Sequence, residues 1–150
     1  MATMEAKDIM KILPQRYPYL MVDRVLELEV EGEIGEWRVV ALKNASADAP
    51  WAAGHFPGNP VMPGTMIEEA MAQAGAILIA SLPDSAEKVA FNAGWEEVRH
   101  RGQVRPGDQL IIEASGLRMK GDLGKGKVMA KVDGAVVSEG VLKFGRLPRE

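Results

Sequence analysis

The chain has 150 residues, 47% of them hydrophobic and 26% charged, and a net charge of −3 at pH 7. This size and composition are typical of a single domain spanning residues 1–150, and the small acidic excess argues against a nucleic-acid-binding protein. The sequence has no cysteine, which excludes disulfides and cysteine nucleophiles, and its two histidines, His55 and His100, lack a metal-binding spacing. We therefore expect no metal site.

The N-terminal sequence MATMEAKDIM lacks the basic and then apolar segments of a signal peptide. No uncharged apolar stretch reaches the ~18 residues that a membrane-spanning helix needs. We therefore expect a cytoplasmic protein without membrane insertion.

Hydrophobic periodicity predicts one helix and two strands in the first third of the chain. Residues 5–13 have apolar side chains at helical spacing up to Pro14, which ends the helix because proline lacks the backbone N–H. Residues 22–31 alternate between apolar and acidic side chains, as in a half-buried strand. A second strand is predicted over residues 34–42, after a turn at Gly32.

Strand patterns return in the last third of the chain. Asp133 and Gly134 form a hairpin signal, because the tight turn favours residues that tolerate positive φ. Residues 106–108, Pro-Gly-Asp, mark another connection. The predicted strands cover residues 87–93, 95–101, 109–119, 126–132 and 135–144.

Between the two groups of strands lies a predicted helix over residues 66–82 that has almost no polar face. Its polar residues are Glu68, Glu69, Gln73 and Ser81. Such a helix must be covered by other elements. One long buried helix and about six or seven antiparallel strands predict an α+β fold, in which a strongly curved sheet wraps around the helix. An exposed sheet edge would favour oligomerisation.

Two adjacent carboxylates occupy the start of this helix. Thr65 and Glu68 have the spacing of a capping box, which gives Glu68 a structural role. Glu69 has no such partner and lies among apolar residues. It is either a solvated or cap-assisting residue, or a desolvated carboxylic acid suited to general acid catalysis.

The segment before the helix, residues 54–64, has three glycines and three prolines around His55. Loops held rigid in this way commonly position catalytic groups, although a lone loop histidine is more often a surface residue. Gly64 lies where free helix N–H groups favour negative charge. His55, Glu69 and these N–H groups together could form a proton-transfer site.

Two stretches of the sequence carry a family resemblance: GHFPGNPVMPG at 54–64 and EAMAQAGAIL at 69–78. With LPQRYPYLMVDRV at 13–25, VRPGDQLIIEA at 104–114 and VDGAVVSEGVLKFG at 132–145, they resemble the hot-dog-fold 3-hydroxyacyl-acyl carrier protein dehydratases of fatty acid synthesis. The resemblance covers nearly the whole chain.

The resemblance implies reversible dehydration of a (3R)-3-hydroxyacyl thioester to the trans-2-enoyl thioester. The catalytic residues would be His55, which removes the C2 proton, and Glu69, which protonates the departing C3 hydroxyl. The Gly64 N–H would bind the thioester oxygen. Glutamate at position 69 resembles the subclass without obligatory isomerisation. Glu68 occupies a usually apolar position, so which of the two carboxylates faces the cavity stays open.

The resemblance also implies partners but no cofactor beyond the phosphopantetheine arm that carries the substrate. The active site would be shared in a homodimer, with His55 of one chain facing Glu69 of the other, and such dimers often assemble into a trimer of dimers. The acyl carrier protein is acidic. Arg99, Arg101 and Arg105, beside His100, form either its docking surface or an ordinary solvated strand face.

Several apolar residues have two interpretations. Six residues would line an acyl tunnel or belong to the core, since methionine fills irregular gaps in either setting: Phe56, Met62, Met66, Ile67, Met71 and Phe91. Two other functions also stand as alternatives on the same fold: an acyl thioesterase that activates water with Glu69, and a non-catalytic acyl-binding subunit. A related polyketide pathway would use the same chemistry as fatty acid synthesis.

Overall fold

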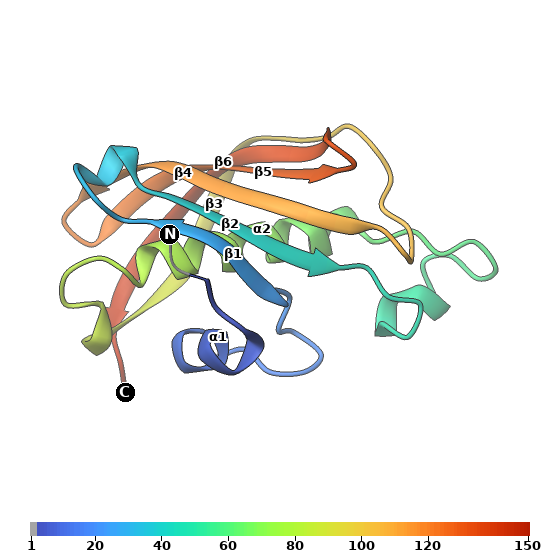
Figure 1. The fold of residues 1–150 in the computed structure, drawn as a ribbon, viewed down its shortest axis with the longest axis horizontal. Helices are drawn as coiled ribbons and strands as arrows, with labels where there is room; N and C mark the ends of the chain where they lie inside the picture. Colours follow the sequence, from blue (N-terminus) through green and yellow to red (C-terminus); the bar gives the residue numbers. More distant parts are fainter. Residues whose placement is uncertain (1–2) are drawn as a thin grey trace.

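Six antiparallel strands form one curved sheet in the computed structural model, which describes residues 3–150 (Figure 1). Their spatial order is β1-β2-β4-β5-β6-β3, so β1 and β3 are the edge strands of this described part. With the long helix described below, the sheet confirms the predicted α+β class. The strands are β1 (Arg24–Glu29), β2 (Arg38–Asn44), β3 (Lys88–His100), β4 (Gln109–Lys120), β5 (Leu123–Val132) and β6 (Ala135–Pro148).

The hairpin between β5 and β6 lies where the sequence predicts it. Asp133 and Gly134 have φ values of 49° and 81°, as a tight two-residue turn requires. β4 agrees with its predicted range to within a residue, whereas β5 begins earlier, at Leu123, and β6 continues to Pro148. Both strands of this hairpin therefore extend beyond the residues whose apolar pattern predicted them.

The two strands predicted over residues 87–93 and 95–101 form a single strand, β3. Its pairing with β6 shifts register between Asn92 and Gly94 and again after Glu96, with no turn between. Gly94 has a φ of 149°, which glycine adopts without steric cost. The predicted break is wrong because a bulge bends a strand without ending it.

The strand predicted over residues 34–42 begins later than expected. Residues Ile34–Glu36 form a 3-10 helix, η1, and β2 starts at Arg38. Glu33 and Glu36 cap this turn reciprocally, and the Glu33 N–H donates to Oε2 of Glu36 over 3.2 Å. Local capping outweighs the alternating pattern at these residues.

Two α-helices pack on the sheet in the described residues. α1 (Ala6–Ile12) ends before Pro14, as predicted, and buries Ile9. The predicted long helix is confirmed as α2 (Gly64–Ile79), which starts and ends slightly earlier than the range 66–82. Figure 1 shows α2 lying along one face of the sheet.

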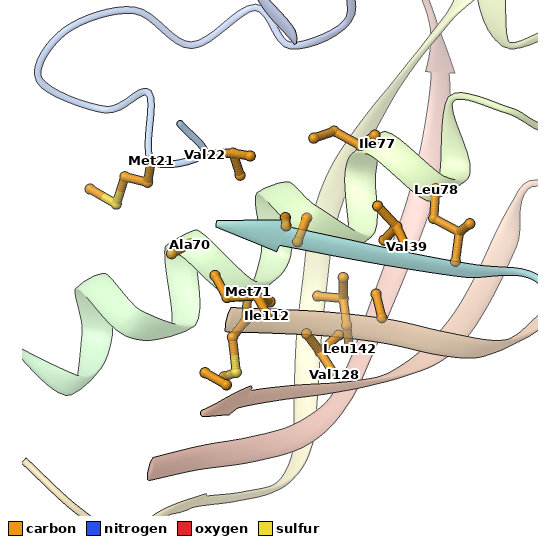
Figure 2. Packing of buried hydrophobic residues seen from close by; sticks show 14 of the residues in the cluster. Met21, Val22, Val39, Ala70, Met71, Ile77, Leu78, Ile112, Val128 and Leu142 are labelled. Carbon is orange, nitrogen blue, oxygen red and sulfur yellow. The ribbon is translucent and has the colours of Figure 1, made fainter. Parts of the chain in front are cut away.

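The core lies between α2 and the sheet (Figure 2). Met71 and Leu78 of α2 belong to one buried cluster with Val39 of β2, Ile112 of β4 and Val128 of β5. Burying each large side chain of this kind stabilises the fold by ~1.5–3 kcal/mol. This packing fixes the axis of α2, and with it the positions of the polar residues on its other flank.

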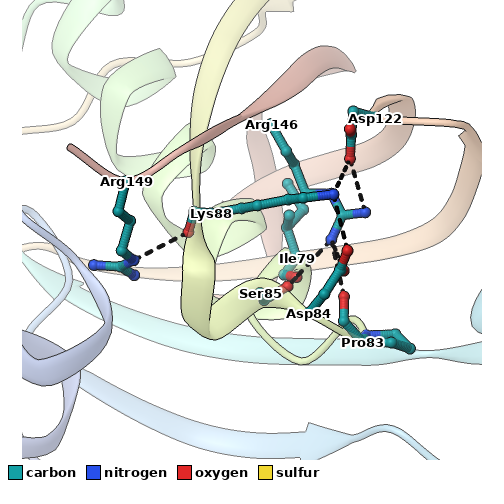
Figure 3. Close-up of polar contacts among 8 residues, drawn as sticks. All are labelled: Ile79, Pro83, Asp84, Ser85, Lys88, Asp122, Arg146 and Arg149. Carbon is teal, nitrogen blue, oxygen red and sulfur yellow. Dashed lines mark hydrogen bonds and ion pairs between the residues drawn. The ribbon is translucent and has the colours of Figure 1, made fainter.

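An ion-pair cluster fastens the segment after α2 to the sheet (Figure 3). The Lys88 ammonium lies 2.8 Å from carboxylate oxygens of both Asp84 and Asp122. Arg146, nearly buried, lies 3.1 Å from the same two carboxylates. The hydrogen bonds from Lys88 are the main reason that the pKa of each aspartate is lowered from its ordinary value. The cluster joins the start of β3 to β6 and the β4–β5 turn.

Candidate active site

His55 lies in the irregular segment between β2 and α2, which projects beyond the end of the sheet at the right of Figure 1. Its Nδ1 is 2.7 Å from the carbonyl oxygen of Val61. A carbonyl oxygen only accepts hydrogen bonds, so in the neutral ring Nδ1 carries the proton and Nε2 keeps its lone pair. The loop therefore presents Nε2 of His55 as a base.

Hydrogen bonds within the loop hold this histidine in place. The Val61 N–H donates to the His55 carbonyl over 2.7 Å, and Phe56 and Asn59 exchange two backbone bonds. The Phe56 ring stacks on the imidazole with their centres 4.2 Å apart. The Met62 N–H donates to the Val104 carbonyl over 2.8 Å, which ties the loop to the segment after β3. The projecting loop is thus internally braced.

Glu69 lies on the half-buried flank of α2 and lines an open hollow of about 260 Å³. The hollow runs between α2 and the edge strand β3, with β6 contributing to its wall. Its lining is mostly apolar, as a site for an acyl chain requires. The apolar lining residues are Ala72, Ala76, Ile79, Ala90, Phe91, Leu142 and Phe144.

Gln73 holds the Glu69 carboxyl group in position. Its Nε2 donates to Oε1 of Glu69 over 2.8 Å and also to the Tyr19 carbonyl, while its Oε1 accepts from the Met21 N–H over 2.8 Å. The side chain is almost fully buried. The sequence marks Gln73 as one of the few polar residues of the helix but does not indicate this role. The i, i+4 spacing from Glu69 on an otherwise apolar helix was the available signal.

Gly64 is the first residue of α2, and the helix has no side-chain cap. Among residues 3–150, no acceptor is found for the backbone N–H groups of Gly64 and Thr65, which belong to the unpaired first turn. The predicted capping box is wrong, because the helix begins before Thr65. Glu68 instead lies with its Oε1 3.0 Å from Nε2 of His100.

Within one chain, the structure does not join His55 to Glu69 by a hydrogen bond. The His55 side chain is bonded to Val61 in the projecting loop, and the Glu69 carboxyl is bonded to Gln73 more than one turn into α2. Glu69 is five residues beyond Gly64, or about 7.5 Å along the helix axis. The two sequence-predicted catalytic groups therefore have separate hydrogen-bond partners within one protomer.

Of the six residues named for an acyl tunnel, Phe91 of β3 lines the hollow beside Glu69, and Ile67 and Met71 are buried in the core. The other three lie apart from the hollow. Phe56 is exposed and stacks on His55, Met62 is buried in the core, and Met66 packs against that core. None of the three lines the hollow. Residues of β3 and β6 line it instead, and they became neighbours of Glu69 only through the sheet topology.

The arginines named for docking lie at the end of β3 and in the segment after it. Arg99 and Arg101 are exposed, and Arg101 pairs with Glu139 over 2.9 Å. Arg105 donates from Nη1 to Oδ1 of Asn59 over 2.7 Å, which places it on the loop of His55. One of the three arginines, Arg105, is therefore bonded to the loop that carries the candidate base.

Comparison with known proteins identifies the family. The sequence model of the FabA-like domain matches residues 13–141, which is most of the chain. The chain belongs to the FabA-like family. Both parts of the candidate site, the loop of His55 and the first turns of α2, fall inside the matched range.

Curated relatives of this FabA-like chain match it along nearly its whole length. It is 46% identical over 141 residues to the 3-hydroxyacyl-[acyl-carrier-protein] dehydratase FabZ of Oceanobacillus iheyensis, covering 94% of this chain and 97% of the relative. A relative with the same name from Ruminiclostridium cellulolyticum is 49% identical over 138 residues, covering 92% of this chain and 94% of the relative.

Solved structures confirm the fold of the FabA-like chain. A hot-dog-like protein from Thermanaerovibrio acidaminovorans superposes with a TM-score of 0.60 at 16% identity, covering 74% of this chain and 81% of that one. The hot-dog fold predicted from the sequence is therefore confirmed. Among residues 3–150, no group of three or more His, Asp or Glu side chains could hold a metal ion, and no helix is long and apolar enough to cross a membrane.

Proposed function

We propose that the chain is a 3-hydroxyacyl-acyl carrier protein dehydratase, a hydro-lyase of fatty acid biosynthesis. The observation that carries this proposal is the 46–49% identity to FabZ relatives over more than nine-tenths of the chain. The reaction converts a (3R)-3-hydroxyacyl thioester into the trans-2-enoyl thioester and water. It moves two protons and no electrons to an acceptor, so the proposed chemistry calls for no redox cofactor.

His55 acts as the base in the proposed mechanism. Its Nδ1 is engaged by the Val61 carbonyl, which leaves Nε2 free to take the proton from C2. Glu69, in its protonated form, gives a proton to the C3 hydroxyl, which leaves as water with the electrons of its C–O bond. The C2–H electrons form the double bond. Each positioned proton transfer contributes ~10²–10⁴-fold to the rate.

Gly64 supplies the third element of the proposed mechanism. Negative charge develops on the thioester oxygen as the C2 proton leaves, and a free N–H at the start of α2 is suited to donate a hydrogen bond to that oxygen. The positive end of the α2 dipole lies at the same place and also stabilises negative charge on the thioester oxygen. One oriented donor of this kind contributes ~10²–10³-fold.

We place the complete site between two copies of the chain. No hydrogen bond joins His55 to Glu69 in the described protomer, His55 does not line the Glu69 hollow, and β3, which borders that hollow, is an edge strand of the described residues. The exposed Phe91 side chain and the partly buried alanines of α2 leave this border apolar. A second copy docked along β3 would cover the border and bring its own His55 loop toward Glu69. A trimer of such dimers is a further assembly that light scattering would resolve by mass.

The substrate reaches this site on the phosphopantetheine arm of an acidic carrier protein in the proposed function. Arg105 contacts the loop of His55 through Asn59, and the exposed Arg99 and Arg101 lie at the end of β3 in the same stretch of chain; we infer that these arginines form the surface where a carrier helix docks. Charge reversal at Arg99 and Arg101 is expected to weaken carrier-linked turnover and its salt dependence, since both depend on opposite charges. Unchanged turnover and salt dependence would show that these arginines form an ordinary solvated face.

The decisive assay supplies a 3-hydroxyacyl carrier protein and follows the enoyl product by mass spectrometry. Wild type should form the enoyl thioester, and both His55→Ala and Glu69→Gln should lose most of the activity while staying folded. Release of free carrier thiol would instead identify a thioesterase, and tight binding without turnover would identify an acyl-binding subunit. An inactive Glu68→Gln beside a fully active Glu69→Gln would refute the assignment of the acid.

A further inference from the structure

His100 is the centre of a polar contact that the proposed catalytic steps do not use. Its Nε2 lies 3.0 Å from Oε1 of Glu68 on α2, and its Nδ1 lies 2.8 Å from Oγ of Ser138 on β6. Ser138 is fully buried and is the direct cross-strand partner of His100. The three residues, here named the His100 bridge, connect α2 to the two sheet strands β3 and β6.

The chemistry of the partners fixes the protons in the His100 bridge. An ionised carboxylate only accepts, so Nε2 of His100 carries a proton and donates it to Glu68. In the neutral ring Nδ1 then accepts from the Ser138 hydroxyl, and the hydroxyl has no other proton to give. Every polar atom of the imidazole is therefore engaged, which holds the ring in one orientation.

The imidazole in this orientation lies directly against Gly64. A Cβ atom added to Gly64 would lie 2.9 Å from Nε2 and 3.1 Å from two ring carbons of His100. Gly64 and Glu68 are four residues apart and so share one face of α2. The ring thus contacts the first residue of the helix while its Nε2 is bonded one turn further on. The side chain of His100 is 37% exposed, so the contact is at the rim of the fold rather than in its core.

We propose that the His100 bridge positions the backbone N–H of Gly64 toward the thioester oxygen. This inference rests on the proposed function, because the N–H has a catalytic role only in that reaction. α2 has no side-chain cap, and its first N–H groups have no acceptor in the described chain, so the usual local restraint on a first turn is missing. The His100 bridge replaces that restraint with one anchored in the sheet. Glu68 and His100 are positioning residues and do not contact the reacting atoms.

The test compares variants that keep or remove the two hydrogen bonds. Glu68→Gln retains an oxygen that accepts from His100, whereas Glu68→Ala has none. His100→Phe keeps an aromatic ring against Gly64 but loses both bonds. Glu96→Ala is the matched control, because Glu96 joins β3 to Lys125 of β5 and Lys143 of β6 without touching α2. All variants are assayed for enoyl product with a 3-hydroxyacyl carrier protein, and their melting temperatures are recorded.

Glu68→Ala and His100→Phe are each expected to lower kcat by about tenfold or more with KM changed less than about twofold, because a donor that acts in the transition state affects kcat. Glu68→Gln and Glu96→Ala should retain near wild-type kcat. The double variant Glu68→Ala/His100→Phe should lose no more than either single variant, since the two residues act as a unit. An unchanged kcat, or a loss that follows the melting temperature alone and is equal in Glu96→Ala, would overturn the positioning role. An inactive wild type would refute the proposed function instead.

Discussion

Gln73 donates a hydrogen bond from Nε2 to Oε1 of Glu69 over 2.8 Å, one turn apart on α2. The Gln73 amide cannot rotate away, because its other contacts are the backbone of Tyr19 and Met21 in the segment before β1. One oxygen of Glu69 is therefore held by a fixed donor. Within the described residues the other oxygen has no hydrogen-bond partner, and Glu69 lines the hollow where the proposed proton transfer takes place.

The first prediction concerns Gln73→Leu. This change leaves the buried Met21 N–H without its partner, which costs about 1–3 kcal/mol, whereas the carbonyl of the exposed Tyr19 can bond to water. The melting temperature should fall by roughly 2–4 °C for each kcal/mol lost. Activity should fall further than stability, because Glu69 also loses its orienting donor. Thermal unfolding and kcat measured together separate the two effects.

Gln109→Leu is the control for this prediction. Gln109 is an exposed residue at the start of β4, and within residues 3–150 its side chain bonds only to Asn44 across the strands. Its replacement should change the free energy of unfolding by no more than about 0.5 kcal/mol. A Gln73→Leu protein with the melting temperature and kcat of wild type would show that Glu69 needs no orienting partner.

The second prediction concerns Gly64→Ala. Alanine is favoured over glycine inside a helix by about 1 kcal/mol, but its Cβ would meet the His100 ring at 2.9 Å. Overpacking of this kind typically costs about 1–3 kcal/mol, so the net effect should be a lower melting temperature. Adding His100→Ala should restore part of the loss by opening the space.

Gly54→Ala provides the matched control in the same loop. Gly54 has a negative φ of −109°, and an added Cβ meets nothing within 4 Å. The melting temperature of the Gly54→Ala variant should equal or exceed that of wild type. If Gly64→Ala is as stable as Gly54→Ala, the His100 ring moves aside freely and does not restrain the helix start.

Helices and strands with a regular spacing of apolar residues were predictable from the sequence. Places where a strand continues through an interruption of that spacing were not. The apolar run that forms α2 and the Asp133–Gly134 turn each follow from local rules about burial and positive φ. The continuity of β3 could not be predicted in this way. Its second irregularity includes Glu97, a non-glycine residue with a φ of 53° that the pairing with β6 imposes on the chain.

The candidate site likewise has a part that local sequence motifs predict and a part that they do not. The resemblance picked out His55, Gly64 and Glu69 because they lie in two short motifs. The contact between Glu68 and His100 joins residues 32 positions apart, on α2 and β3. No local spacing relates them, whereas Thr65 and Glu68 have the local spacing of a capping box, which predicts a different partner for Glu68. Only the packing of α2 on the sheet shows its partner.

The third prediction concerns acid stability. The pKa values of Asp84 and Asp122 are lowered by hydrogen bonds from Lys88, so both carboxylates favour the folded state when ionised. The stability that they contribute is present above the unfolded aspartate pKa of ~3.9 and is lost as the pH falls through the lower folded value. The double variant Asp84→Asn/Asp122→Asn should therefore melt below wild type at pH 7, with the difference shrinking below about pH 4.

Two comparisons sharpen this measurement. Salt at about 1 M should reduce the pH 7 difference, because these carboxylates are exposed enough to be screened. Glu31→Gln, at an exposed site in the turn after β1, should leave the melting temperature unchanged at both pH values. A difference between the double variant and wild type that stays constant from pH 7 to about pH 2.5 would show that the cluster acts through packing and not through charge.

The fourth prediction tests whether two copies of the chain share the site. His55→Ala and Glu69→Gln should each be inactive alone. In a mixed dimer, however, one site receives His55 from the Glu69→Gln chain and Glu69 from the His55→Ala chain, so that site is intact. Random pairing of equal amounts makes half of the dimers mixed, each with one of two sites restored, so activity should return to about a quarter of wild type. The mixture is prepared by co-expression and assayed for enoyl product, with each variant co-expressed with itself as the control. If His55 and Glu69 of the same chain formed the site, every chain in the mixture would lack one of the two groups, and no activity would return.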